Sequence, residues 1–346
     1  VGYRAGLLVT TGTNNTLIGG LSGDAITTAS NNTAVGYESF SANTTGTANT
    51  ALGTFSAKLN TTGNYNVALG YASLEANTTG ANNTSIGFRS LDANTTASNN
   101  TAVGYNALTA NTTGGSNNAF GESALRSATT AGHNSAFGNN ALLSNTTGAG
   151  NQAFGNNALT ANTTGSSNVA VGYNSQVLVT TGAQNTSLGA YALQTTTTGT
   201  HNIGVGYNAI STTATADGQC TLGNGDISNL RCNDQSISAL SDSRDKTDVI
   251  DSPYGLDFIN TVRPVQFKWE TRDGNVKDGS TRIGFLAQEL LAATDGNNAV
   301  LDLVLDDNPD KLEAKYGNLL PIAIQAIQEL STQLDAALAR ITTLEG

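Results

Sequence analysis

The sequence predicts an all-β solenoid of 17-residue repeats, a parallel β-roll or β-helix, followed by a smaller α+β region that ends in a coiled coil. Glycine recurs every 17 residues from Gly2 to Gly223, fourteen times without an insertion or deletion. Apolar residues recur in heptads near the end of the chain. Charge is uneven, because residues 1–216 hold five acids and four bases while the remainder holds 21 acids and 11 bases. Two different kinds of protein therefore share one chain.

The residues around each repeat glycine follow a fixed pattern. The residue before the glycine is apolar in every repeat, and Asn stands four residues before it in twelve consecutive repeats. A large apolar residue usually follows four residues after the glycine, and Asn-Thr-Thr seven residues after it. A strict period without insertions indicates that each repeat stacks on the previous one, since an insertion would shift every later side chain out of its column.

Seventeen residues fit one solenoid coil with two short strands and two turns, and like residues stack about 4.8 Å apart. Gly, Asn and Thr between the short apolar segments disfavour helix. Fourteen coils at this spacing give a shaft of about 65 Å. The Asn column is expected to form a ladder of hydrogen-bonded amides, with Asn66, Asn83 and Asn100 among its members.

The repeat glycines are expected to take turn conformations forbidden to other residues, as at Gly70, Gly87 and Gly104. Each coil offers only a few apolar side chains for its core, and several of these are Ala. Packing of several chains side by side would supply the missing burial. Aromatic residues directly after the glycine are candidates for that interface, although contact with a ligand is the alternative: Tyr37, Tyr71, Phe88, Tyr105, Tyr173 and Tyr207.

Composition argues against several classes of function. The repeat region has no basic stripe, which argues against nucleic acid as a partner. No apolar run reaches the 18 or so residues of a membrane span, and no signal peptide is visible. Its acids are too scattered to suggest the paired carboxylates of a glycosidase. The charged residues of positions 1–216 are Asp24, Glu38, Glu75, Asp92, Glu122, Arg4, Lys58, Arg89 and Arg126.

Isolated residues give little sign of cofactor or metal sites, and none is predicted. Cys220 and Cys232 are read as small, partly buried residues, with a disulfide as the alternative. His133 and His201 fall in turns and lack further ligands for a metal, so they are read as surface residues. The chain starts at Val1 and contains no Met, which suggests a fragment whose N-terminal attachment region is missing.

The pattern N-T-A-V-G-Y-x-A-L, as at 100–108, resembles the head repeats of YadA-like trimeric adhesins. The resemblance covers residues 1–223 and implies a left-handed parallel β-roll packed as a trimer. The coil length departs from that family, which leaves the strand positions open.

After the repeats, residues 224–240 are read as a neck. Four segments then follow in order: A-L-S-D-S-R-D-K-T-D-V-I at 239–250, R-P-V-Q-F-K-W at 263–269, I-G-F-L-A-Q-E-L at 283–290, and Y-G-N-L-L-P-I-A-I-Q-A-I-Q-E-L at 316–330. Together they resemble the intramolecular chaperone of endosialidases and phage tail spikes, peptidase family S74, over residues 241–346. The third segment is read as core.

This resemblance implies a domain that trimerises, guides folding of the fibre and then cuts itself off by a serine–lysine dyad. It assigns Ser241 as nucleophile, Lys246 as base and Leu240–Ser241 as the scissile bond. A serine needs a neighbouring base, and lysine is one only when its pKa falls towards neutrality. An S-x-x-K pair of Ser243 and Lys246 is a rival, but its companion motifs are absent. Asp242 and Arg244 are expected to hold the loop.

The tail is a heptad repeat within a coiled coil expected at 318–346. Its a positions are Leu320, Ile327, Leu334 and Ile341, and its d positions are Ala323, Leu330, Ala337 and Leu344. These residues do not fix the number of strands. The resemblances and the thin solenoid core point to three.

These features suggest a homotrimeric phage tail fibre or spike, made in the host cytoplasm and carried on the virion tail. Its expected partners are a host cell-surface receptor, for which a glycan is one option, and other tail proteins bound through the missing N-terminal part. A cellular YadA-like adhesin and a spike with glycan-hydrolase activity are the alternatives. The only catalysis expected acts on the protein's own chain.

Overall fold

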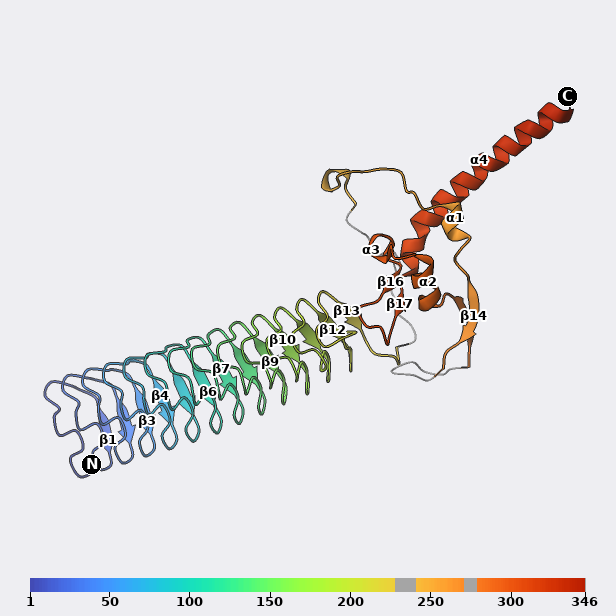
Figure 1. The fold of residues 1–346 in the computed structure, drawn as a ribbon. Coiled ribbons are helices and arrows are strands. Elements are labelled where there is room, and N and C mark those ends of the chain that lie inside the picture. The colour runs from blue at the N-terminus through green and yellow to red at the C-terminus, as the bar shows by residue number, and fades with distance from the viewer. Residues whose placement is uncertain (228–240, 271–278, 346) are drawn as a thin grey trace. The chain divides into compact units, whose positions relative to one another are not determined.

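The computed structural model describes residues 1–227, 241–270 and 279–345. The chain forms two compact units, Val1–Asn224 and Gly225–Gly346. We call the first the shaft and the second the C-terminal unit. Figure 1 shows the coils of the shaft stacked one after another, with one short strand in each.

The shaft is a parallel β-solenoid whose 13 strands form one sheet in sequence order. Each strand pairs with the next in register, so that Thr33 lies beside Thr50 and Ala34 beside Ala51. The strands are β1 (Thr16–Ile18), β2 (Thr33–Val35), β3 (Thr50–Leu52), β4 (Val67–Leu69), β5 (Thr84–Ile86), β6 (Thr101–Val103), β7 (Asn118–Phe120), β8 (Ser135–Phe137), β9 (Gln152–Phe154), β10 (Val169–Val171), β11 (Thr186–Leu188), β12 (Ile203–Val205) and β13 (Cys220–Leu222).

The expectation of two strands in each coil is wrong, because the -A-L- segment forms turns. Leu108 has a φ of 54° and Asn106 a φ of 53°, which is the left-handed region and cannot continue a strand. The backbone of this corner still bonds to neighbouring coils. The Asn106 amide donates to the Phe88 carbonyl at 3.0 Å, and the Leu108 amide donates to the Ala124 carbonyl at 2.9 Å. The corner therefore satisfies its amides without strand geometry.

Left-handed backbone recurs at three places in each coil and restricts which residues can stand there. The non-glycine shaft residues with positive φ include Leu, Asn, Ala, Ser, His and Tyr, but no Thr, Val or Ile. Thr is abundant elsewhere in the shaft. β-branched side chains are the least tolerant of positive φ, so this exclusion follows from the backbone.

The interior of the shaft is narrow and partly polar. Its apolar core combines a column of Leu, four residues after the repeat glycine, with Ala from the strands; Leu74, Leu91, Leu108 and Ala102 are examples. Two columns of Asn are also buried, one four residues before the repeat glycine and one seven residues after it. Each coil buries few apolar side chains and a large share of buried Asn side chains. Hydrogen bonds between coils therefore contribute more to the packing of the shaft than they do in an ordinary apolar core.

The C-terminal unit is a small α+β assembly that ends in a long helix. Phe258, Leu290, Leu303 and Val304 lie in its core. Its elements are η1 (Ser243–Asp245), α1 (Leu256–Ile259), β14 (Val265–Lys268) paired antiparallel with β15 (Thr281–Gly284), α2 (Ala287–Ala293), α3 (Asn298–Leu301), β16 (Val304–Leu305) paired antiparallel with β17 (Glu313–Ala314), η2 (Tyr316–Asn318) and α4 (Leu319–Glu345).

The reading of 283–290 as core is wrong in part. Leu290 is buried, whereas Ile283 is 80% exposed and Leu286 is 40% exposed. The reason is geometric: Ile283 lies on the exposed side of the two-stranded β14–β15 sheet, and Leu286 stands at the cap before α2. Phe285 packs edge-on against Tyr316, with ring centroids 5.4 Å apart.

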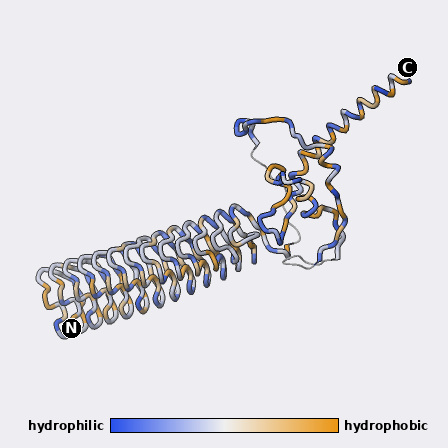
Figure 2. The backbone as a smooth tube through the Cα atoms, in the orientation of Figure 1, coloured by the Kyte–Doolittle hydropathy of each residue, from blue (hydrophilic) through white to orange (hydrophobic). Residues whose placement is uncertain are grey.

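Helix α4 packs one face on its own chain and leaves another face uncovered. Ile322 and Ala326 are buried. Figure 2 shows hydrophobic and hydrophilic residues alternating along this helix. At the heptad positions Leu330 is 54% exposed, Leu334 58% and Ile341 49%. This apolar stripe is long and continuous, as in a helix that packs against further helices.

Candidate functional site

The predicted serine and lysine meet in the loop that begins the C-terminal unit. The Nζ atom of Lys246 donates a hydrogen bond to the Oγ atom of Ser241 at 2.7 Å. The intervening 3-10 turn η1 brings the two residues together, since the Lys246 amide donates to the Ser243 carbonyl. The geometry joins Lys246 to Ser241, while Ser243 contributes only its backbone to this contact.

Asp242 and Arg244 hold the turn between them. The Asp242 carboxylate accepts the Arg244 amide at 2.9 Å and so caps η1. The Arg244 guanidinium also pairs with this carboxylate, Nη2 to Oδ2, at 2.6 Å. The Arg244 side chain, followed by its backbone amide, holds the pKa of Asp242 below its usual value. Both residues position the loop.

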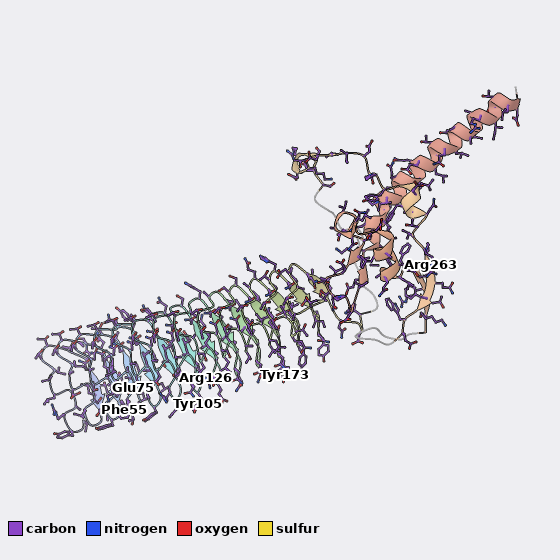
Figure 3. The ribbon with its side chains drawn as sticks, in the orientation of Figure 1. Phe55, Glu75, Tyr105, Arg126, Tyr173 and Arg263 are labelled. Carbon is purple, nitrogen blue, oxygen red and sulfur yellow. The ribbon has the colours of Figure 1, made fainter. Side chains whose placement is uncertain are left out.

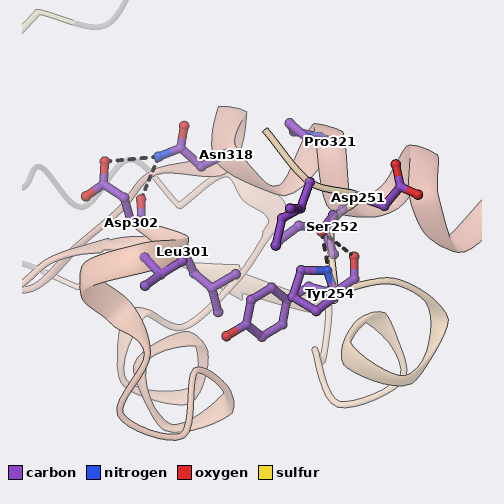
Figure 4. A pocket seen from close by; sticks show the side chains of 11 residues that line it. Asp251, Ser252, Tyr254, Leu301, Asp302, Asn318 and Pro321 are labelled. Atoms are coloured by element: carbon purple, nitrogen blue, oxygen red, sulfur yellow. Dashed lines mark hydrogen bonds between the residues drawn. The ribbon is translucent and has the colours of Figure 1, made fainter. Parts of the chain in front are cut away.

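The chain after the dyad is fixed at a pocket of about 550 Å³ beside α4 (Figure 4). The Ser252 hydroxyl accepts the Tyr254 amide at 3.2 Å and donates to the Tyr254 carbonyl at 3.1 Å. Asn318 closes the other side of the pocket through a hydrogen bond from its Nδ2 to the Asp302 carbonyl at 2.6 Å. The dyad precedes this pocket-lining segment in the chain.

The dyad loop itself is open to solvent in a single chain. Ser241 and Lys246 are both exposed. Val249 is 76% exposed and Ile250 82% exposed, which is unusual for two adjacent aliphatic side chains. A lysine accepts a proton only once burial disfavours its charged form. The arrangement therefore supplies a nucleophile and a base in contact, in surroundings that keep the lysine hydrated.

Two residues of the predicted set lie outside the described residues. Leu240, on the other side of the predicted scissile bond, is one, and Cys232 is the other. Cys220 lies on β13 and is exposed, so the reading of it as partly buried is wrong: among the described residues β13 is the last strand of the sheet.

The asparagines predicted to form a ladder are buried and joined from coil to coil. The Asn83 amide donates to Asn66 Oδ1 at 3.0 Å, and the Asn100 amide donates to Asn83 Oδ1 at 3.0 Å. Side-chain Nδ2 of Asn83 donates to the Ala97 carbonyl at 2.9 Å. The Asn83 side chain thus satisfies two backbone groups of the following coil, one through its oxygen and one through its nitrogen.

The repeat glycines are required for two reasons. Gly70, Gly87 and Gly104 have φ values of 134°, 135° and 139°, which side chains rarely tolerate. A Cβ atom on Gly87 would also lie 2.4 Å from the carbonyl oxygen of Gly104. Conformation and close approach both exclude other residues from this column.

A cluster of charges and rings on the shaft was missed by reasoning from the sequence. Lys58 pairs with Glu38 at 2.7 Å and lies 4.7 Å from the centre of the Phe55 ring. The hydrogen bond from Lys58 is the main cause that lowers the pKa of Glu38. Burial, and then the charge of Asp92, raise the pKa of Glu75. The period of 17 places Glu38 above Phe55 and lines up Lys58, Glu75 and Asp92, in two columns three positions apart, so it could have revealed this cluster.

The two histidines occupy equivalent left-handed turn positions, with φ values of 61° at His133 and 58° at His201. Both are exposed. Across the described ranges, no group of three His, Cys, Asp or Glu side chains is placed to hold a metal ion. In the same ranges no helix is both long and apolar enough to cross a membrane.

Comparison with known proteins places the dyad within a recognised domain. Residues 241–301 match the family Peptidase_S74, described as chaperone of endosialidase, and so form a domain of that kind. The match begins at Ser241 and ends before the segment at 316–330. Searches of curated proteins and of solved structures find no match to this chain.

Proposed function

We propose that residues 241–346 form an intramolecular chaperone that brings three shafts together and then cuts itself off between Leu240 and Ser241. The observation that carries this proposal is the 2.7 Å contact from Lys246 Nζ to Ser241 Oγ, at the first residue of the chaperone-of-endosialidase match. The exposed apolar stripe of α4 supports assembly, because a single chain leaves it uncovered.

The cut needs only groups of this chain and one water molecule. Ser241 Oγ gives its proton to Lys246 Nζ and attacks the carbonyl carbon of Leu240. The amide nitrogen of Ser241 leaves with the proton that Lys246 returns. An ester then joins the Leu240 carbonyl to Ser241 Oγ. Water hydrolyses this ester, which leaves a carboxylate on Leu240 and restores the serine hydroxyl on a new amino terminus.

Assembly would control when the cut occurs. Lys246 can take the proton only if it is desolvated, and Ser241, Lys246, Val249 and Ile250 are all exposed in one chain. Covering this loop by other chains would remove water from the lysine. Cleavage would then follow assembly, so that only assembled shafts lose the chaperone.

The test is a denaturing gel with intact-mass measurement of freshly expressed full chain. We expect two fragments, residues 1–240 and 241–346. Ser241→Ala should give an uncut chain that still has the native mass of a trimer. Lys246→Arg should also stay uncut, because a guanidinium keeps the charge but cannot act as base.

The matched control is Ser243→Ala, which should be cut like the parent chain. Cleavage of Ser241→Ala, or an uncut Ser243→Ala, would remove Ser241 from the role of nucleophile. A fragment boundary elsewhere than Leu240–Ser241 would contradict the assigned bond.

The released shaft is proposed to be the host-attachment part of a phage tail fibre or spike. A β-solenoid joined to a chaperone-of-endosialidase domain supports this role. Labelled, cleaved shaft should bind intact bacterial cells of a susceptible strain and not cells stripped of surface glycans. Equal retention by both would remove glycan as the receptor, and retention by no strain in a broad panel would favour a spacer.

A further inference from the structure

One edge of the shaft differs chemically from all others. Nine of the ten charged side chains of the shaft lie at the first, second or fifth position after a repeat glycine, and the tenth is Asp217, eleven residues after Gly206. The position before the glycine is apolar in all fourteen repeats, from Val1 to Leu222. We call these fourteen residues the pre-glycine column. Charged side chains therefore stand in columns close to the pre-glycine column, while the pre-glycine column itself carries no charge.

The pre-glycine column is apolar, yet every one of its residues is exposed or half-buried. Leu52 is 42% exposed, Leu188 52% and Leu222 53%. Other outward columns are polar, such as the second Thr of each Thr-Thr pair, which is exposed from Thr11 to Thr198. An apolar stripe along a whole solenoid is much larger than the isolated apolar residues normal on a monomer surface, and it marks an interface.

Aromatic rings accompany this column and show which kind of partner fits. Tyr71 and Phe88 stack with centroids 5.3 Å apart and planes 12° apart, and Phe120 and Phe137 stack at 4.7 Å and 9°. Figure 3 shows Tyr105 and Tyr173, which belong to the same edge. In the two stacked groups, Tyr71–Phe88–Tyr105 and Phe120–Phe137–Phe154, the rings cover each other's faces and turn their edges outward. The rings nearer the two ends of the shaft meet edge to face instead. Ring edges suit the faces of other rings, whereas a sugar ring would have to separate the stack.

We propose that identical shafts pack in parallel and in register through the pre-glycine column, which lies along their common rotation axis. A residue beside an axis parallel to the shaft faces copies of itself at the same height. A charge there would meet its own sign, which is destabilising. A column suited to the axis is therefore uncharged, apolar and open to the outside, and the pre-glycine column has all three properties. That the copies number three rests on the proposed function.

The charged positions then form the rim of the interface. Both signs occur there, as in Glu38, Lys58, Arg89 and Asp92. Away from the axis a residue meets a different position of the neighbouring chain, so opposite charges can face one another. Apolar centre and charged rim are the usual anatomy of a protein interface.

The test uses cysteines in the full chain with Cys220→Ser and Cys232→Ser. Leu69→Cys places a thiol in the pre-glycine column, and oxidised samples should run as disulfide-linked dimers with one chain of each assembly left unlinked. Thr79→Cys is the control, since it is exposed in the polar Thr column, and it should stay unlinked. Val103→Cys repeats the test should Leu69→Cys fail to fold, as judged by circular dichroism.

Register is tested by co-expressing Leu69→Cys and Val103→Cys chains with different tags. Two coils separate these positions, about 10 Å, which exceeds the reach of a disulfide. Each chain should link only to its own kind, and links between the two kinds would overturn the in-register packing. A trimeric native mass in which neither column variant links, or in which Thr79→Cys links, would overturn the interface and leave the chaperone proposal standing. A monomeric native mass would overturn both.

Discussion

Different kinds of contact stabilise the interior of the shaft and the interior of the C-terminal unit. In the shaft nearly every contact repeats at a spacing of 17 residues, and the Asn columns satisfy buried backbone groups within one chain. The C-terminal unit has short elements, a small core and a helix whose heptad residues are exposed. A stacked repeat satisfies its polar groups within one chain, whereas the C-terminal unit leaves the heptad residues of α4 uncovered.

The largest expected effect is on assembly through α4. The double variant Leu330→Glu, Leu334→Glu places charge on an exposed apolar stripe, so the single chain should stay folded. Burial of each Leu against other helices contributes about 1.5–3 kcal/mol, which the double variant removes in every chain. Native mass spectrometry should show monomers, and the chain should stay uncut.

Gln328→Glu is the control for this variant, since it adds charge to an exposed position outside the stripe. It should remain assembled and be cut. Assembly of the double variant at the parent concentration would show that α4 does not hold the copies together.

Next in size is Gly87→Ala in the shaft. The substitution forces a φ of 135° on Ala and brings its Cβ within 2.4 Å of the Gly104 oxygen, so we expect a loss of about 3 kcal/mol or more. Thermal unfolding of the cleaved shaft followed by circular dichroism would measure it. Gly20→Ala is the matched control, because its Cβ would meet Tyr37 at an ordinary 3.4 Å; similar losses in both would refute the argument.

Substitutions in the Asn column seven residues after the repeat glycine are expected either to lower or to raise the stability of the shaft. Asn94→Ala removes donors to Asn77 and Ala97 and should cost about 2 kcal/mol. Asn111 Oδ1 is buried without a partner because Ala128 stands in the next coil. Ala128→Asn should supply that partner and stabilise the shaft by about 1 kcal/mol. Chemical denaturation should shift in opposite directions for the two variants; a destabilised Ala128→Asn would mean that the coil cannot hold the larger side chain.

The smallest effects are electrostatic and differ in sign. The pKa of Glu38 is lowered on folding, so its contribution is present above the unfolded pKa and is lost as pH falls through the folded pKa. The pKa of Glu75 is raised, so its ionisation at higher pH weakens folding. At neutral pH Glu38→Gln should lower the melting temperature slightly and Glu75→Gln should raise it. As pH falls, the Glu75 difference should vanish first, because its folded pKa is raised, and the Glu38 difference last, because its folded pKa is lowered; the opposite order would refute this assignment.

The period made the stack, the Asn ladder and the role of the glycines predictable, because identical spacing places identical residues in contact. It did not reveal that the corner at Asn106 and Leu108 is left-handed, since the -A-L- pattern equally suits a short strand. The absence of Thr, Val and Ile from those positions in the repeats before Gly206 was the available signal. The pairing of Ser241 with Lys246 came from the family resemblance, because six polar residues also suit a solvated turn. The exposure of Ile283 could not be predicted from an apolar run, which does not show which of its residues a single chain covers.

The buried Asn of each Asn-Thr-Thr segment bears on how the protein can be produced. These segments carry the acceptor pattern for N-linked glycans, yet Asn145 is fully buried and its Nδ2 donates to the Gly148 carbonyl at 2.9 Å. A sugar on that nitrogen would remove the bond and could not fit inside the coil. Secretion through a eukaryotic pathway would modify the chain before it coils and block stacking at each marked repeat. Production in a bacterial cytoplasm avoids this, so the same sequence should yield a folded shaft in one host and a glycosylated, unstacked chain in the other.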